Sequence, residues 1–310
     1  MKLERPDVYI QNWKIYKCSH KYNDLINKIV EMIKDNHIKA GVIGHPIDHS
    51  LSPRLHQYWL NNYEINGSYE AFDIHPDELK EFIKNLSVNG FIGINVTVPF
   101  KEKVAKLVDV LDENASRLGA VNTIVVGPDG LLYGSNTDGF GFMENLISNF
   151  PQWRPEIGPA VILGAGGAAK SVAASLVDCN VSEIRLTNRT HKKTQSLIKK
   201  IGGSIKACKW ENRSNLLKDA TLLVNTTTLG MTGKPPLDIN LEFLPVNAVV
   251  IDIVYSPLMT PLLQQAKDRS NPIINGIGML LHQARPGFKQ WFGNDPEVTK
   301  KLENHILLGV

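Results

Sequence analysis

The stretch "AVILGAGGAAKSVAASL", residues 160–176, constrains the fold of this chain more than any other. A short apolar strand, Val161 to Leu163, runs directly into a glycine-rich turn, and a helical segment follows. This order matches the G-x-G-x-x-A form of the dinucleotide fingerprint in its strand–turn–helix context. Glycines allow the backbone to approach a pyrophosphate closely, and the helix N-terminus supplies free N–H groups. The sequence therefore predicts a Rossmann-type domain whose turn binds a dinucleotide cofactor. The expected contacts are Gly164, Ala165, Gly166, Gly167 and Ala168.

The end of the next strand distinguishes NADP from NAD. NAD sites usually carry an acid there, which binds the ribose 2′-OH. In "EIRLTNRTHKK", residues 183–193, the strand end offers no carboxylate after Glu183 and is followed by several cations. An arginine can hold a 2′-phosphate with its planar fork and stack on the adenine. A solvated basic helix start would explain the lysines but not the missing acid, so we expect NADP. Its expected contacts here are Asn188, Arg189, Thr190 and Lys193.

Short apolar runs alternate with helical segments along most of the chain. The expected strands cover residues 42–43, 71–74, 92–98, 121–126, 160–163, 183–187, 222–225 and 249–254. The expected helices of the first half cover residues 53–63, 76–86 and 100–111. This alternation predicts βαβ units, a mostly parallel sheet and an α/β fold class. The segment "NFPQWRPEIGP" around residue 150 is rich in proline and glycine and is typical of a boundary region. We therefore expect two α/β domains.

The first 39 residues differ from the rest. In "YNDLINKIVEMIKDNH" the apolar residues recur at helical spacing, which predicts one amphipathic helix. The residues before it are polar and aromatic without a clear period, so we interpret 1–39 as an N-terminal extension. It carries charges and no apolar h-region, and we expect no secretory signal.

Composition excludes several classes of protein. The 310 residues include 34 Lys and Arg against 31 Asp and Glu, so the net charge of +3 indicates neither a nucleic-acid partner nor a membrane surface. No apolar run approaches the roughly 20 residues of a membrane span. The three cysteines are widely separated, which favours a reducing cytoplasm over a disulfide framework. The composition predicts a cytoplasmic protein without a nucleic-acid or membrane partner, and it leaves open whether the protein is a monomer or a homodimer.

Nine motifs in order resemble the shikimate dehydrogenase family, which reduces 3-dehydroshikimate with NADPH in aromatic amino-acid biosynthesis. They are "GVIGHPIDHSLSPRLHQ", "GINVTVPFKE", "GAVNT", "GSNTDGFG", "GAGGAAKS", "NRT", "NTTTLGM", "DIVYSPLMTPLL" and "NGIGMLLHQA". The resemblance spans residues 40 to about 293. It implies an N-terminal α/β substrate-binding domain with an inserted Rossmann-type NADP-binding domain and a cleft between them. The implied bounds are 40–140 with 277–310 for the first domain and 141–276 for the second.

The same resemblance implies the catalytic residues. The lysine of "NVTVPFK", Lys101, corresponds to the family's acid/base, and the aspartate of "NTDG", Asp138, corresponds to its partner. The chemistry suits ketone reduction, because a cation that donates a proton stabilises the negative charge that develops on oxygen. A nearby carboxylate keeps a lysine charged and oriented. A surface lysine and an Asx-turn aspartate are the alternative interpretation.

The resemblance also implies substrate and nicotinamide contacts. Ser50, Ser52 and Tyr255 correspond to the family's carboxylate-binding residues, although the serines also suit a helix N-cap before Pro53. The residues expected to bind the ring hydroxyls are Asn95, Thr97, Asn122, Asp138 and Gln283. All but Asp138 are uncharged, as expected for neutral hydroxyls. Residues expected on the nicotinamide side are Met231, Gly276 and Met279, although Met279 suits a plain core position equally well. Ile253 is also expected to contact the cofactor.

Three alternatives to this assignment predict features that the sequence does not show. An NAD-dependent quinate/shikimate dehydrogenase tends to carry an acid where Asn188 and Arg189 stand. A non-catalytic NADP-binding regulator would lack Lys101 or Asp138, and this chain has both. A metal site on His45, His49 and His56 lacks a carboxylate or cysteine to complete it. We therefore expect an NADP-dependent oxidoreductase and no metal.

Overall fold

The computed structural model describes residues 37–308, which form two compact units. Residues 138–282 form the inserted unit, and residues 37–137 with 283–308 form the split unit. The chain passes between them after residues 137 and 282, where the sequence placed the passages after 140 and 276. Residues 1–36, which include the predicted amphipathic helix and most of the predicted extension, lie outside the described residues. The first strand begins at Ile38, so the last residues of that predicted extension belong to a sheet.

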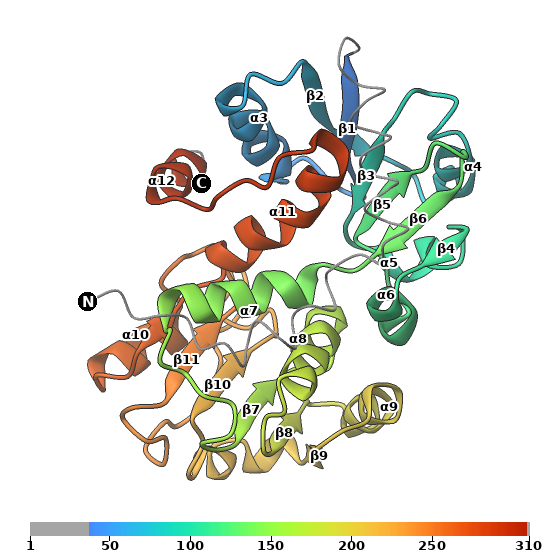
Figure 1. The fold of residues 1–310 in the computed structure, drawn as a ribbon. Helices are drawn as coiled ribbons and strands as arrows, with labels where there is room; N and C mark the ends of the chain where they lie inside the picture. Colours follow the sequence, from blue (N-terminus) through green and yellow to red (C-terminus); the bar gives the residue numbers. More distant parts are fainter. Residues whose placement is uncertain (1–36, 309–310) are drawn as a thin grey trace. The chain divides into compact units, whose positions relative to one another are not determined.

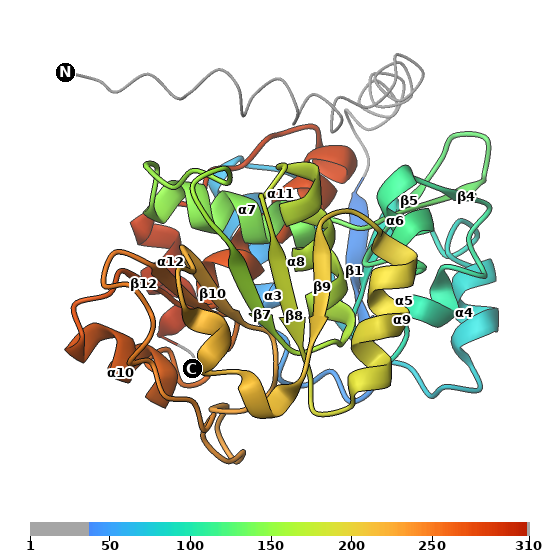
Figure 2. The same ribbon diagram turned by 90° about the horizontal axis from the view of Figure 1, so that it is seen from below.

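The inserted unit contains a six-stranded parallel sheet in the order β12-β11-β10-β7-β8-β9 (Figures 1 and 2). The strands are β7 (Ala160–Leu163), β8 (Ile184–Thr187), β9 (Ile205–Cys208), β10 (Leu222–Asn225), β11 (Val249–Asp252) and β12 (Ile273–Ile274). The helices are α7 (Asp138–Asn149), α8 (Gly167–Asp178), α9 (His191–Ile201) and α10 (Pro261–Asp268), with the 3-10 turns η2 (Trp210–Asn212) and η3 (Asn215–Leu217). Every residue of β7, β10 and β11 is buried, as in parallel sheets covered on both faces. This strand order is that of the doubly wound Rossmann fold.

The predicted strands of this unit agree closely with the structure. Strands 160–163 and 222–225 are confirmed at both ends, and the other two differ by one or two residues. The boundary predicted around residue 150 is wrong, because "NFPQWRPEIGP" joins α7 to β7 within the inserted unit. Helix α7 packs against α8, where Gly139 lies so close to Ser175 that an added Cβ would stand 2.2 Å from its Oγ. Proline and glycine therefore mark a turn here and not a domain boundary.

The split unit contains a mixed six-stranded sheet in the order β2-β1-β3-β5-β6-β4 (Figure 1). Its strands are β1 (Ile38–Gly44), β2 (Gly67–Asp73), β3 (Gly93–Val96), β4 (Val110–Leu111), β5 (Thr123–Val126) and β6 (Leu132–Ser135). Its helices are α3 (Ser52–Asn62), α4 (Leu79–Lys84), α5 (Lys101–Val104), α6 (Glu113–Leu118) and α12 (Lys300–Leu307), with the second part of α11 (Ile277–Phe292). Trp291 of α11 is fully buried and donates from Nε1 to the carbonyl of Ile124 on β5, 3.0 Å away. The C-terminal segment is therefore part of this unit's core.

The sheet of the split unit is mostly parallel, as predicted, and β5 is the one of its six strands that runs antiparallel to its neighbours β3 and β6. One expectation for this unit is wrong. The helix predicted at 100–111 is only α5, after which the chain turns into β4. Asp109 accounts for the change, since its N–H donates to the carbonyl of Leu132 and its carboxylate accepts from the Leu132 N–H. Pairing with the neighbouring chain segment overrides the local helical pattern.

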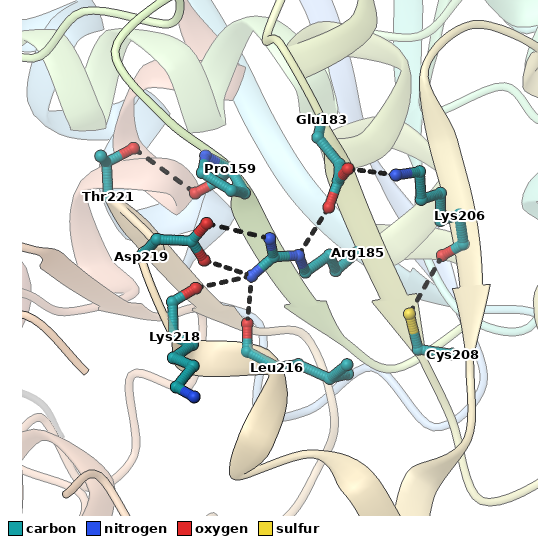
Figure 3. Close-up of polar contacts among 9 residues, drawn as sticks. All are labelled: Pro159, Glu183, Arg185, Lys206, Cys208, Leu216, Lys218, Asp219 and Thr221. Carbon is teal, nitrogen blue, oxygen red and sulfur yellow. Dashed lines mark hydrogen bonds and ion pairs between the residues drawn. The ribbon is translucent and has the colours of Figure 1, made fainter. Parts of the chain in front are cut away.

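One arginine joins three segments of the inserted unit (Figure 3). Arg185 on β8 donates to Glu183 at 2.6 Å, to both carboxylate oxygens of Asp219, and to the carbonyls of Leu216 and Lys218. Its side chain is only 17% exposed. Lys206 on β9 also binds Glu183, and together the two cations lower the pKa of that carboxyl. The guanidinium thereby attaches the chain between β9 and β10 to the sheet.

Arg185→Met should lower the free energy of unfolding by about 1–3 kcal/mol, because it leaves partly buried acceptors without their charged hydrogen-bond donor. Lys206→Met is the matched control. Its side chain is 68% exposed, so losing its pair with Glu183 should cost about 0–1 kcal/mol. Urea denaturation followed by circular dichroism measures both changes. Equal losses in the two variants would contradict the role given to Arg185.

Candidate functional site

Lys101 is placed by the packing on both sides of it. It is the first residue of α5, and the neighbouring Phe100 and Val104 are fully buried. Its carbonyl accepts a 2.9 Å hydrogen bond from the N–H of Val121, next to β5. Its own side chain is only partly buried. The short helix therefore holds the lysine backbone in one position while two apolar neighbours anchor it.

The two serines lie at the start of α3. Ser52 is the first residue of this helix and is 8% exposed, whereas Leu51 stands at the N-cap without a side-chain cap. The capping alternative for these serines is therefore wrong. Instead, the Ser50 Oγ accepts a 3.3 Å bond from the Ser52 N–H, and the Ser52 side chain lies close enough to the buried Tyr69 phenol to act on its pKa. Both hydroxyls thus belong to one short turn.

Asn95 on β3 is oriented by three hydrogen bonds. Its Oδ1 accepts from the Tyr69 hydroxyl at 2.6 Å, and its Nδ2 donates to the Asn122 carbonyl at 3.0 Å and to the Thr123 Oγ1 at 3.1 Å. A carbonyl only accepts, so the amide nitrogen must face Asn122. The side chain is 6% exposed. This geometry leaves one orientation of the amide.

Asn122 and Gln283 continue the same network. The Asn122 Nδ2 donates to the Thr137 Oγ1 at 2.9 Å and to the Gln283 Oε1 at 3.2 Å. Its Oδ1 accepts from the Thr123 hydroxyl and from the Thr137 N–H. The Thr137 hydroxyl in turn donates to the Gln283 carbonyl at 2.8 Å. The structure therefore brings together Ser52, Asn95, Asn122 and Gln283, which the sequence expects to bind substrate. Thr97 lies just after β3, and its N–H donates to the Ile43 carbonyl.

Aromatic side chains pack together beside this network. The His56 ring stacks flat on Tyr69 at 3.8 Å between centroids and also contacts Trp59, Phe288 and Trp291. Burial lowers the pKa of His56 to about 3, so the ring is neutral at physiological pH. Its two nitrogens have no hydrogen-bond partner among residues 37–308. In the same part of the chain no group of three or more His, Cys, Asp or Glu side chains is placed to hold a metal ion.

The glycine-rich turn of the inserted unit fits a pyrophosphate. Gly164 has φ +116°, and a Cβ on it would stand 2.4 Å from the Thr226 Oγ1, so only glycine suits this position. Around Gly166 and Gly167 nothing lies within 4 Å of an added Cβ. Gly166 is the N-cap of α8 without a side-chain cap, and the first turn of α8 contains no acid. The open backbone and the helix N-terminus are the features that bind a phosphate. Ala165 is buried beside them, and Ala168 is partly buried.

The residues expected at the 2′-phosphate lie directly after β8. The strand ends at Thr187, and Arg189, Thr190, Lys192 and Lys193 are exposed. Asn188 donates from Nδ2 to the carbonyl of Thr190 at 3.1 Å, which closes the turn into α9. The first turn of α9 contains no acidic residue. The side chains available to an anion at this strand end are therefore cationic or neutral.

A buried polar pair at the ends of β10 and β11 was not found from the sequence. The Asn225 Nδ2 donates to Asp252 at 3.0 Å, and Asp252 also accepts from the Thr260 hydroxyl and the Val254 N–H. Both side chains are fully buried, and burial raises the pKa of Asp252. The pair fixes the loop that carries Ile253 and Tyr255. The only sequence signal for the Asn225–Asp252 pair is that each of the two residues stands at the end of an apolar strand.

Ile253 and Gly276, both expected to contact the cofactor, touch in the structure. A Cβ on Gly276 would stand 2.0 Å from the Ile253 carbonyl oxygen, and the Gly276 N–H donates to the Val254 carbonyl. Met279 follows in α11 and is partly buried, as is Met231 in the loop after β10. Burial raises the pKa of Tyr255, so its phenol is a neutral donor.

The expected site residues divide between the two units. The split unit holds Ser50, Ser52, Asn95, Thr97, Lys101, Asn122 and Gln283. The inserted unit holds Tyr255, the expected cofactor residues and Asp138, which is 8% exposed in the first turn of α7. Because Lys101 and Asp138 belong to different units, their pairing stays a prediction from the resemblance. Tyr69, Thr123 and Thr137 were missed by the sequence analysis, although Thr137 stands inside the "NTDG" motif.

Comparison with known sequences identifies the family. The family description "Shikimate dehydrogenase substrate binding domain" matches residues 42–124, and "Shikimate / quinate 5-dehydrogenase" matches residues 156–231. A protein of Paramagnetospirillum magneticum named shikimate dehydrogenase (NADP(+)) is 52% identical over 86% of this chain and 97% of its own length. The chain belongs to the shikimate dehydrogenase family. A protein of the same name from Dinoroseobacter shibae is 49% identical over 85% of this chain and 95% of its own.

Solved structures agree on the fold. Shikimate 5-dehydrogenase of Thermus thermophilus, in complex with NADP(H) and shikimate, has a TM-score of 0.78 at 33% identity and covers 88% of this chain and 100% of its own. Quinate dehydrogenase of Corynebacterium glutamicum, in complex with NAD, has a TM-score of 0.81 at 28% identity and covers 89% of this chain and 100% of its own. The predicted two-domain α/β fold is therefore confirmed. Within residues 37–308 no helix has both the length and the apolar character needed to cross a membrane.

Proposed function

We propose that this protein is an NADP-dependent shikimate dehydrogenase, which reversibly reduces 3-dehydroshikimate to shikimate in the pathway to aromatic amino acids. The observation that carries the proposal is the network of Asn95, Asn122 and Gln283, three neutral amides held in defined orientations beside the Ser50–Ser52 turn. Such groups read hydroxyls by hydrogen bonds, and the serine hydroxyls donate to a carboxylate. Shikimate carries both kinds of group. The relatives named shikimate dehydrogenase (NADP(+)) support the same assignment.

The cofactor roles rest on the inserted unit. The residues Gly164 to Ala168 approach the pyrophosphate, and the N-terminus of α8 faces its charge. Arg189 binds the 2′-phosphate with its planar fork, with Asn188, Thr190 and Lys193 beside it. Ile253, Gly276 and Met279 lie against the nicotinamide. NADPH, when bound, supplies the hydride for reduction.

The catalytic roles rest on Lys101 and Asp138. During reduction the Lys101 ammonium donates a proton to the oxygen on which negative charge develops, and during oxidation its amine accepts that proton. Asp138 keeps the lysine charged and oriented and binds a ring hydroxyl. Ser50, Ser52 and Tyr255 hold the substrate carboxylate, and Thr97 binds a ring hydroxyl with the three amides. We also infer that the enzyme acts in the cytoplasm, since Cys179 and Cys208 are free thiols.

The second candidate is an NAD-dependent quinate/shikimate dehydrogenase, which the similarity to the Corynebacterium glutamicum enzyme favours. The two candidates differ in what the end of β8 must bind. NAD requires an acceptor for the free 2′-OH, and an acid is the usual one. In this chain the residues after Thr187 are Asn188 and Arg189. Arg189 is exposed and suits a phosphate better than a hydroxyl, so NADP is the preferred cofactor.

Shikimate with NADP should be the best of four substrate and cofactor pairs. The purified protein is incubated with shikimate or quinate and with NADP or NAD, and kcat/KM is measured from the absorbance of the reduced cofactor. Loss of the 2′-phosphate removes a charge-assisted contact worth about 1.5–3 kcal/mol, so NAD should be roughly 10- to 150-fold worse. Equal or better turnover of quinate with NAD would favour the second candidate. No turnover of any pair would favour a regulator without catalysis.

A further inference from the structure

Tyr69 is a buried tyrosine at the centre of the polar network of the split unit. It lies on β2 and is 3% exposed. Its hydroxyl donates to the Asn95 Oδ1 at 2.6 Å. The phenol therefore holds a residue that the proposed function assigns to a ring hydroxyl of the substrate.

The Asn95 side chain is oriented by its hydrogen bonds. The Asn95 amide nitrogen already donates to Asn122 and Thr123, and its oxygen accepts from Tyr69. Without the phenol, the amide oxygen loses this donor and the side chain loses one of the three bonds that orient it. If the Asn95 amide rotates by half a turn, its oxygen and nitrogen exchange places. The substrate then meets a donor where it needs an acceptor, or an acceptor where it needs a donor.

The ring of Tyr69 is held in place from several sides. His56 stacks on it at 3.8 Å with parallel ring planes, and Trp291 lies at 6.1 Å between centroids. The histidine has no hydrogen-bond partner within the described residues, so it acts here as a flat neutral surface. Burial also raises the pKa of Tyr69 well above its usual value, which keeps the phenol protonated as a donor. The hydroxyl therefore has one fixed position and one fixed direction of donation.

We propose that Tyr69 is a positioning residue for substrate recognition, whose hydroxyl fixes the orientation of the Asn95 amide. The inference rests on the proposed function, because it assumes that Asn95 contacts shikimate. Tyr69 itself acts only through Asn95. Its hydroxyl determines how well the substrate fits and leaves the proton transfer to Lys101.

Tyr69→Phe tests the proposal, because it removes the hydroxyl and keeps the stacked ring. KM for shikimate should rise about 5- to 150-fold, since a buried acceptor loses its donor, while kcat and KM for NADP change far less. Tyr133→Phe is the matched control. It removes a 2.7 Å bond from a phenol to Asp129 at an exposed turn of the same unit, and its KM for shikimate should stay at the wild-type value.

The background variant Asn95→Ala separates positioning from general stability. If Tyr69 acts through Asn95, adding Tyr69→Phe to Asn95→Ala should cause little further rise in KM. An unchanged KM in Tyr69→Phe, or an equal rise in both backgrounds, would overturn the proposal. A variant that fails to fold by circular dichroism would assign the hydroxyl a structural role and also overturn it. The wild-type protein reports on the proposed function separately: no turnover or calorimetric binding of shikimate there would refute that function itself.

Discussion

Lys101→Ala should lower kcat for shikimate oxidation by about 10²–10⁴-fold, the usual contribution of a positioned acid/base. The variant removes the group that exchanges a proton with the reacting oxygen, while the proposed carboxylate and amide contacts remain. KM for shikimate should therefore change less than kcat. Steady-state kinetics with shikimate and NADP measure both constants.

Lys103→Ala is the matched control for this experiment. Lys103 lies two residues further along the same short helix and is exposed. Its loss removes an equal charge from the same helix and should leave kcat near the wild-type value. Wild-type turnover in Lys101→Ala would contradict the proposed mechanism. It would show that Lys101 is an ordinary surface lysine without a role in proton transfer.

Asp138→Asn examines whether the aspartate serves the lysine. An amide cannot hold an ammonium by charge, so kcat should fall here as well. If the two residues act together, the double variant should be scarcely slower than Lys101→Ala alone, because residues of one catalytic group are not additive. Multiplied losses in the double variant would show independent roles.

Arg189→Ala has the second large effect, because it should weaken NADP binding roughly 10- to 150-fold while NAD binding changes little. The cause is the loss of a charge-assisted contact to the 2′-phosphate, which NAD does not have. NAD is thus an internal control for the fold of the variant. Dissociation constants of both cofactors from fluorescence titration measure the difference.

Lys193→Ala distinguishes the arginine from its neighbours. Both residues are exposed after β8, but a lysine offers a point charge and an arginine offers a planar fork. The lysine variant should lose less affinity for NADP than the arginine variant. An unchanged NADP affinity in Arg189→Ala, together with a loss of affinity in Lys193→Ala, would indicate that the lysines bind the 2′-phosphate in place of Arg189.

Local sequence patterns predicted the structure correctly where it depends on residues that are adjacent in the chain. The strands at 160–163 and 222–225 were predicted at both ends because they are continuous apolar runs bounded by turn residues. The glycine turn before α8 was readable for the same reason, since Gly164 and its neighbours are adjacent in the chain. The helix predicted at 100–111 failed because Asp109 bonds to Leu132, which no local pattern shows.

The sequence by itself determined the α/β class, the Rossmann-type unit, the family and the residue types offered to NADP and substrate, because these features depend on short motifs in order along the chain. Only the tertiary structure decided the antiparallel strand β5 of the split unit, the Asn225–Asp252 pair, and the network that joins Tyr69 to Gln283 through Asn95 and Asn122. These features require buried polar atoms from distant segments to meet at hydrogen-bond distance. Such partners become known only when the strands that carry them are placed side by side.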